Sequence, residues 1–189
     1  MGAKVKEKFL VEDMRLHFNI VGEMQEDNIE VPDDFDISEK FDLKQITKSD
    51  KSKDKFIYAY TVSGISANNR DWTPGVVKSI AQQVLDKLPV GHLGHIKPED
   101  VGYALPEPQV VWFGSKVEEL DDGSVRVWLK GYVLPTAEKA KIWIKAKAID
   151  SISVWGKVRY VMEGDIQKIL SVDLKSIDLS RKLGEGLPA

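Results

Sequence analysis

The alternation of apolar and polar residues predicts β-strands over much of this chain. Residues 56–65 are aromatic and β-branched, a composition that suits a pleated surface. Residues 110–117 and 124–133 have the same character and are joined through Asp121-Asp122-Gly123, whose Asp-Gly pair is typical of a hairpin turn. We therefore expect these two segments to pair antiparallel. Further strands are expected at 152–161 and 169–179, on either side of a break at Gly164.

Two helices interrupt this series of strands. Thr73-Pro74 is typical of a helix start, and apolar residues then recur at helical spacing up to Leu88, just before Pro89. A second amphipathic helix is expected over 137–148. Because the elements do not alternate as regular βαβ units, we predict an α+β fold. Its core would be an antiparallel, barrel-like β-sheet with two or more flanking helices.

The first part of the chain has a different character. Residues 1–50 are acidic in the middle and contain only two short strand-like segments, at 10–11 and 16–21. Residues 48–55 are almost entirely charged or polar, which predicts a solvated loop. We therefore expect a partly irregular N-terminal extension over 1–55 and a main domain over 56–189.

Composition limits the classes of function. A chain of 189 residues is long enough for one compact unit, and its net charge of −3 gives no broad attraction to nucleic acid. The chain has no cysteine, which excludes disulfides, thiolate zinc sites and cysteine nucleophiles. No apolar run approaches the ~20 residues of a membrane-spanning helix, so a soluble, unexported protein is expected. Oxygen nucleophiles and histidine bases remain.

Two histidines lie beside glycines in Gly91-His92-Leu93-Gly94-His95. Imidazole is the usual general base at neutral pH, and either histidine is a candidate. On a regular strand the two would point to opposite faces, so they can act together only if the chain turns between them. An exposed loop pair without chemistry is the simpler alternative, and a metal site would need a third ligand that no local motif supplies.

The candidate nucleophiles lie in the segment 151–156. Ser151 and Ser153 share one strand face, and a serine attacks a carbonyl only when a base accepts its proton. Asp178 is a carboxylate in an otherwise alternating apolar strand and could orient a histidine. The alternatives are the polar face of a half-buried strand for the serines and a solvent-facing aspartate for Asp178. The tryptophans at 112, 128, 143 and 155 are expected in the core.

Taken in order, several segments resemble the tailed-bacteriophage prohead proteases, capsid-maturation serine proteases related in fold to herpesvirus assemblins. The resemblance runs from about Tyr60 to the end of the chain and depends on the order of a histidine segment, a serine strand and a closing strand. The segments that carry it are Val62-Ser63-Gly64, Asn68-Asn69-Arg70-Asp71, Pro89-Val90-Gly91-His92-Leu93-Gly94-His95, Leu105-Pro106-Glu107-Pro108, Val111-Trp112-Phe113-Gly114, Lys130-Gly131-Tyr132-Val133, Ser151-Ile152-Ser153-Val154-Trp155-Gly156 and Leu174-Lys175-Ser176-Ile177-Asp178-Leu179.

This resemblance implies Ser153 as nucleophile and His95 as base, with His92 and Ser151 as alternatives. Many relatives have a glutamate where this chain has Ser176, so the third member is open between Asp178, our choice, Ser176, and a serine–histidine dyad. Arg159 is the candidate for holding an oxyanion-stabilising water.

The resemblance further implies a serine endopeptidase that cleaves phage scaffold and major capsid proteins, and in some cases itself, during procapsid maturation. It would act without cofactor or metal, inside the assembling procapsid in the host cytoplasm, with no nucleic-acid or membrane partner and with self-association left open. Relatives often continue into a scaffold-like extension, which suggests that a chain ending at Ala189 is truncated or self-processed. The alternatives are a non-catalytic phage structural or scaffold-associated protein with the same fold, and a histidine-based metallohydrolase.

Overall fold

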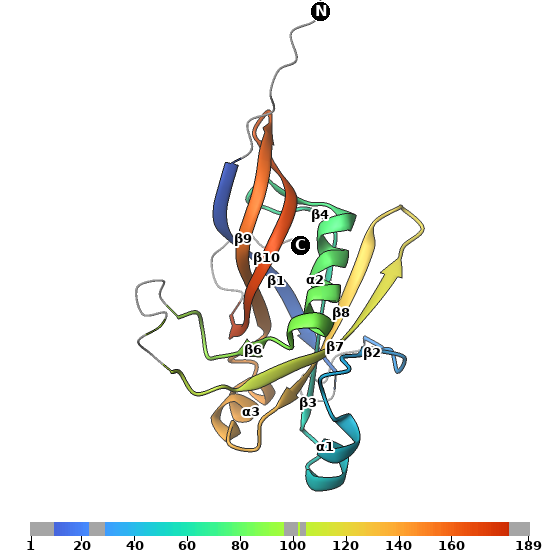
Figure 1. Cartoon of the computed structure of the whole chain (residues 1–189), viewed down its shortest axis with the longest axis vertical. Coiled ribbons are helices and arrows are strands. Elements are labelled where there is room, and N and C mark those ends of the chain that lie inside the picture. Colours follow the sequence, from blue (N-terminus) through green and yellow to red (C-terminus); the bar gives the residue numbers. More distant parts are fainter. Residues whose placement is uncertain (1–9, 23–28, 97–101, 103–104, 182–189) are drawn as a thin grey trace, which may run out of the picture.

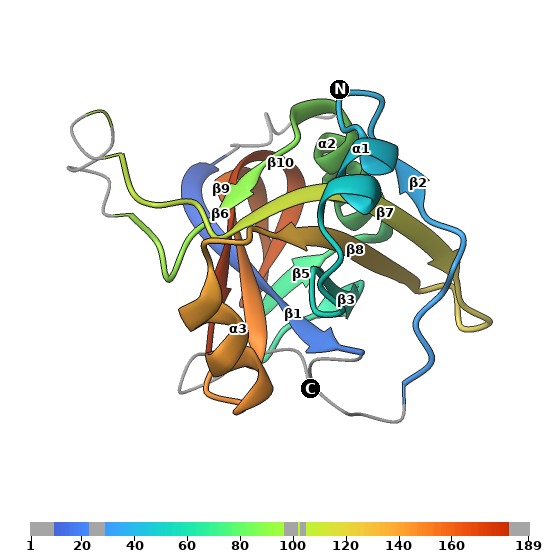
Figure 2. The same cartoon turned by 90° about the horizontal axis from the view of Figure 1, so that it is seen from below.

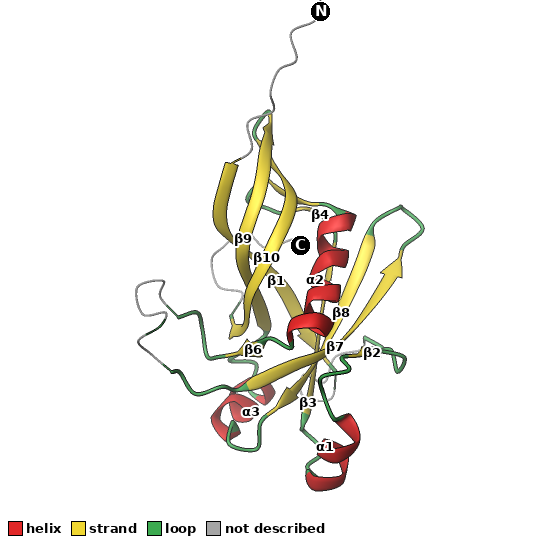
Figure 3. Cartoon of the chain, viewed as in Figure 1, coloured by secondary structure: helices red, strands yellow, loops and turns green. Residues whose placement is uncertain are grey.

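A computed structural model describes residues 10–22, 29–96, 102 and 105–181. In this part of the chain three helices pack around a ten-stranded, open and mostly antiparallel sheet (Figures 1 and 3). The α+β class is therefore as predicted. The helices are α1 (Leu43–Ser49), α2 (Pro74–Lys87) and α3 (Glu138–Lys145). The strands are β1 (Leu10–Val21), β2 (Asp36–Ile37), β3 (Phe56–Val62), β4 (Gly64–Ile65), β5 (Arg70–Trp72), β6 (Val90–Gly91), β7 (Val110–Glu119), β8 (Val125–Val133), β9 (Ser151–Glu163) and β10 (Ile166–Ser180).

The strand order places distant parts of the sequence side by side. It runs β2-β7-β8-β3-β1-β9-β10-β5-β4, and β6 pairs with β7 off this path. Every pairing is antiparallel except that between β10 and β5, which is parallel. The predicted hairpin is present as β7 and β8, and Gly123 at its turn has a φ of 83°, which favours glycine.

β1 corrects the expected organisation of the N-terminal region. The two short segments at 10–11 and 16–21 form one strand that lies between β3 and β9, in the middle of the sheet. Its inward side chains, Met14, Leu16, Phe18 and Ile20, are all buried in the common core. The expected boundary at residue 55 therefore does not separate two independent units within the described chain.

Helix α2 forms where its start signal and apolar spacing predicted it. It begins at Pro74 and ends before Leu88, which adopts the left-handed conformation. Its buried side chains recur at helical spacing and pack against β7, β8 and β10: Val76, Val77, Ile80, Ala81 and Val84. The helix thus covers one face of the curved sheet, as Figure 1 shows.

The other helices differ from expectation. α3 covers 138–145, shorter than the predicted 137–148, and buries Ala140 and Ile144. Trp143, expected in the core, is 37% exposed, because it lies on the outer side of this helix, whereas Trp112 and Trp128 are buried. α1 was not predicted; Asp42 caps it by accepting a hydrogen bond from the Gln45 N–H. None of its residues is buried, so the sequence has no apolar face at helical spacing that would predict this helix.

β9 and β10 form a long hairpin with two irregularities in register. Gly164, with a φ of 63°, makes the turn, and single-residue shifts occur between Ile169 and Ser171 and between Leu174 and Ser176. Each shift moves the pairing by one residue. After both, Asp178 lies opposite Ser153.

A short segment after α2 connects two distant strands. Val90 and Gly91 pair with β7, whereas the Leu179 N–H donates to the His92 carbonyl and the Gly94 N–H donates to the Leu179 carbonyl. Residues 90–94 therefore lie between β7 and the end of β10, as the view in Figure 2 makes visible for β6. Among the described residues, none of the helices is long and apolar enough to cross a membrane.

Candidate active site

His95 and Ser153 are hydrogen-bonded to each other. His95 Nε2 lies 2.9 Å from Ser153 Oγ, although the two residues are 58 positions apart in sequence. Ser153 is 1% exposed in β9, and the His95 side chain is 12% exposed just after the segment that joins β7 to β10. The expected pairing of imidazole and hydroxyl is therefore present.

Asp178 completes a linear arrangement with these two residues. His95 Nδ1 lies 2.5 Å from Asp178 Oδ2, so the imidazole stands between the carboxylate and the Ser153 hydroxyl. Asp178 is 1% exposed, which rules out the solvent-facing alternative. It is buried because β10 is flanked here by β9 on one side and by residues 92–94 on the other.

The hydrogen bonds determine which nitrogen of His95 carries the proton. A carboxylate accepts and cannot donate, so Nδ1 of His95 donates to Asp178. In the neutral ring, Nε2 is then left as an acceptor and faces Ser153 Oγ. This tautomer is the one in which a histidine can remove a proton from a serine.

The Asp178 carboxylate is fully hydrogen-bonded. Oδ1 accepts from the His92 backbone N–H at 2.9 Å and lies 3.0 Å from His92 Nδ1. Oδ2 accepts from Ser176 Oγ at 2.5 Å as well as from His95. A buried charge needs such partners, because each one offsets part of the lost hydration.

Both histidines reach one carboxylate because the chain turns between them. Gly94 has a φ of 75°, a conformation that favours glycine, and its N–H donates to the Leu179 carbonyl. The condition under which the two imidazoles could act together is thus met. The alternative of an exposed histidine pair is wrong, since their side chains are only 17% and 12% exposed.

Core contacts hold the strand that carries Asp178. The buried Trp112 indole Nε1–H donates to the carbonyl of Ile177 at 2.9 Å. Gly91 approaches the same carbonyl so closely that a Cβ built on it would lie 2.2 Å from the oxygen. The site therefore depends on the absence of a side chain at residue 91.

The alternative serines occupy different positions. Ser176 Oγ donates to the Asp178 carboxylate, so it supports the third member rather than replacing it. Ser151 is fully buried on the same strand face as Ser153, and its Oγ has no hydrogen-bond partner among the described residues. The geometry thus favours Ser153 over Ser151 as the activated hydroxyl.

Arg159 does not belong to this site. It is exposed, pairs with Val11 and Ser171, and lies six residues beyond Ser153 on the same strand. At about 3.3 Å per residue the two Cα atoms are roughly 20 Å apart, farther than an arginine side chain reaches. The expectation that Arg159 holds an oxyanion-stabilising water is therefore wrong. Arg159 and Ser153 are close in sequence, but on an extended strand six residues separate them widely in space.

Two neighbours of Ser153 were missed as parts of the site. His17 lies directly opposite Ser153 on β1, so their side chains share one face of the sheet. All three histidines of the chain thus gather around Ser153 and Asp178. The Trp155 ring centroid is 5.9 Å from that of His95, and Lys175 Nζ lies 5.0 Å from the Trp155 ring centroid. The two-residue spacing of Ser153 and Trp155 was a signal for their shared face.

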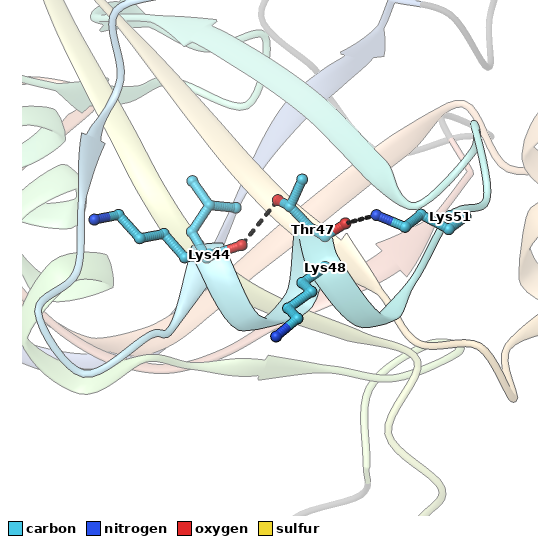
Figure 4. Close-up of a pocket in the computed structure, with 5 residues that line it drawn as sticks. Lys44, Thr47, Lys48 and Lys51 are labelled. Atoms are coloured by element: carbon cyan, nitrogen blue, oxygen red, sulfur yellow. Dashed lines mark hydrogen bonds between the residues drawn. The ribbon is translucent and has the colours of Figure 1, made fainter.

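The described residues contain no group of three or more histidine, aspartate or glutamate side chains arranged to hold a metal ion. A surface hollow of about 480 Å³ lies away from the histidines, on α1, and is lined by Leu43, Lys44, Thr47, Lys48 and Lys51 (Figure 4). Its hydrogen bonds, from Thr47 Oγ1 to the Leu43 carbonyl and from Lys51 to the Thr47 carbonyl, are internal to the helix region. This hollow offers no buried polar group for catalysis.

Comparisons with known proteins found no matching family model, no matching curated protein and no matching solved structure.

Proposed function

We propose that this chain is a serine endopeptidase whose nucleophile is Ser153. The observation that carries the proposal is the unbroken sequence of contacts from Asp178 through His95 to Ser153 Oγ, at 2.5 and 2.9 Å. A hydroxyl, an imidazole in the tautomer that accepts its proton, and a carboxylate that fixes this tautomer are the parts required for acyl transfer.

The proposed reaction has two halves. His95 Nε2 takes the Ser153 proton while Oγ adds to the scissile carbonyl carbon, and the Asp178 charge stabilises the imidazolium that forms. The imidazolium then gives its proton to the leaving amine as the C–N bond breaks, which leaves an acyl ester on Ser153. His95 then takes a proton from a water molecule whose oxygen attacks the ester carbonyl. As the ester bond breaks, His95 gives this proton to Ser153 Oγ.

The substrate class is proposed from the resemblance to prohead proteases. Under this proposal the fold is of the prohead protease type, with an open sheet in which residues 90–94 lie between β7 and the end of β10. The substrates are scaffold and major capsid proteins, and the place of action is the assembling procapsid.

Labelling with a fluorophosphonate tests the nucleophile without knowledge of the natural substrate. We expect one adduct per chain, on Ser153 by peptide mapping, and none in Ser153→Ala. Ser171→Ala is the matched control, because Ser171 is an exposed serine on the neighbouring strand. An intact mass without adduct, or an adduct that persists in Ser153→Ala, would contradict the proposal.

Cleavage of co-expressed scaffold and capsid proteins tests the substrate class. Wild type and Ser171→Ala should process them, and Ser153→Ala should not. Equal processing by wild type and Ser153→Ala would exclude catalysis at Ser153. A labelled Ser153 with no processing would contradict the proposed scaffold and capsid substrates, and the absence of both would favour the non-catalytic structural protein. Activity that chelators abolish would favour the metallohydrolase.

A further inference from the structure

We infer that His92 is a positioning residue, which holds the Asp178 carboxylate so that its other oxygen addresses His95. This inference rests on the proposed function and adds a fourth side chain to its machinery. The two oxygens of the buried Asp178 carboxylate face different histidines: Oδ1 faces His92 and Oδ2 faces His95.

His92 donates two hydrogen bonds to Asp178. Its backbone N–H and its ring Nδ1 both lie on Oδ1, at 2.9 and 3.0 Å. Because the carboxylate cannot donate, Nδ1 of His92 must carry a proton and donate it. Two donors from one residue fix both the position of Oδ1 and the rotation of the carboxylate group.

This rotation decides whether His95 is a useful base. Oδ2 of Asp178 must lie in line with Nδ1 of His95 for Nε2 to be directed at Ser153. Ser176 Oγ also donates to Oδ2 but lies on the same strand as Asp178, so it moves together with the carboxylate. His92 is the donor that links Asp178 to a different segment, the one that also carries His95.

The two imidazoles also compete for the same negative charge. Each donor on a carboxylate makes it a weaker acceptor for the others. The groups around the pair are Ser176 and Asp178 on β10, Ser153 and Trp155 on β9, and His17 on β1, with Lys175 behind Trp155. The carboxyl of Asp178 is the charged group that both rings touch. Removal of the His92 ring ends this competition, but it also frees Oδ1 and lets the carboxylate rotate out of line with His95, and the loss of alignment is the larger effect.

Two substitutions separate positioning from simple packing. His92→Asn puts an amide N–H where Nδ1 stands, and His92→Leu fills the space without a donor. We expect His92→Leu to lower kcat by about 10- to 100-fold with KM nearly unchanged, and His92→Asn to stay within about threefold of wild type. Lys48→Ala, on α1, is the surface control.

A spectroscopic readout does not require turnover. Nδ1 protons donated to a buried carboxylate give proton resonances at unusually low field, and wild type should show one each for His92 and His95. In His92→Leu the first should vanish and the second should broaden and move upfield, because the Asp178 carboxylate is no longer held in line with His95 Nδ1 and their hydrogen bond weakens. In His92→Asn the His95 resonance should stay near its wild-type position.

The inference is overturned if the His95 resonance is the same in wild type and His92→Leu, or if the Asn variant, folded by circular dichroism, moves it as far as Leu does. If the Leu variant does not fold, the His95 resonance in His92→Asn decides alone. A wild type with the expected resonances but no cleavage would refute the proposed function and leave the role of His92 intact.

Discussion

Ser153 and Asp178 lie opposite each other on adjacent strands, yet they are joined through a third residue. The register of β9 and β10 pairs them directly, and His95 bridges them with Nε2 on Ser153 Oγ and Nδ1 on Asp178 Oδ2. Each of the three side chains comes from a different segment, so the sheet register and the turn at Gly94 must both be correct for the arrangement to form.

Substitutions within this arrangement should not be additive. Ser153→Ala, His95→Ala and the double variant are expected to have nearly the same residual activity, because each removes the same proton transfer. Asp178→Asn should lower kcat by about 10³- to 10⁴-fold, since an amide N–H facing His95 favours the wrong tautomer. Steady-state kinetics on a processed substrate measures these effects, and multiplicative losses in the double variant would contradict a coupled unit.

Arg159→Ala should leave catalysis intact. Loss of an oxyanion donor typically costs about 3 to 4 kcal/mol of transition-state stabilisation. Because Arg159 is exposed and roughly 20 Å along the strand from Ser153, its removal is expected to change kcat less than about twofold. A large fall in kcat with an unchanged circular dichroism spectrum would restore Arg159 to the site.

Gly91→Ala should be costly, and Gly75→Ala should not. A Cβ at residue 91 would lie 2.2 Å from the Ile177 carbonyl oxygen, whereas nothing lies within 4 Å of one at residue 75. We expect Gly91→Ala to lower the free energy of unfolding in urea by about 1–3 kcal/mol and to reduce kcat. Gly75→Ala, in the first turn of α2, should be neutral or stabilising by up to about 1 kcal/mol. Equal stability of the two variants would mean that the close approach at Gly91 is not restrictive.

Trp112→Phe isolates the hydrogen bond that holds β10. It removes the Nε1–H that donates to Ile177 and leaves the carbonyl buried without this donor. The expected loss of unfolding free energy is about 1–3 kcal/mol. Trp143→Phe, at a position 37% exposed, should stay within about 0.5 kcal/mol of wild type. Similar urea midpoints for the two variants would argue against a structural role for the indole N–H.

Tyr132 gives a prediction about alkaline pH. Burial, followed by the hydrogen bond to Asp50, raises the pKa of Tyr132 to about 12. In the unfolded chain the phenol ionises near its ordinary value of 10.0. Its contribution to stability is therefore complete below pH 10 and is lost as the pH rises toward 12.

The absorbance of tyrosinate measures this effect. The difference between wild type and Tyr132→Phe should contain a transition near pH 12, and Asp50→Asn should move it to lower pH. A difference transition near pH 10 would show that Tyr132 titrates as an exposed phenol.

Local sequence patterns predicted where helices, strands and turns form, but they did not predict which strands lie next to each other in the sheet. The start of α2 at Pro74 and the turn at Gly123 follow from the conformational limits of single residues, and both were predicted. The position of β1 between β3 and β9 was not, because its partners are distant in sequence; the regular alternation from Met14 to Ile20 was a local signal for a single strand, but it does not specify neighbours. Strand pairing at such distances depends on the whole chain and leaves no local signal.

Some residues of the candidate site were predicted from the sequence, and others were recognised only in the structure. Residue chemistry and the resemblance singled out Ser153, His95 and Asp178, whereas His17 could be recognised only from the register of β1 with β9. Arg159 was misplaced because six residues along a strand span far more distance than six along a helix. The joint contact of His92 and His95 with Asp178 depended on the backbone of Gly94, whose positive φ no pattern in the sequence specified.

The place of β9 has a consequence for biosynthesis. The strand that carries Ser153 is held on one side by residues 10–21 and on the other by residues 166–180, nearly the full length of the described chain. β10 follows β9 directly as a hairpin, but the pairing of β9 with β1 closes a loop that contains most of the described chain, which is slow and must precede the contacts that stabilise it. A nascent polypeptide still on the ribosome therefore lacks the arrangement of Ser153, His95 and Asp178 until β10 has emerged.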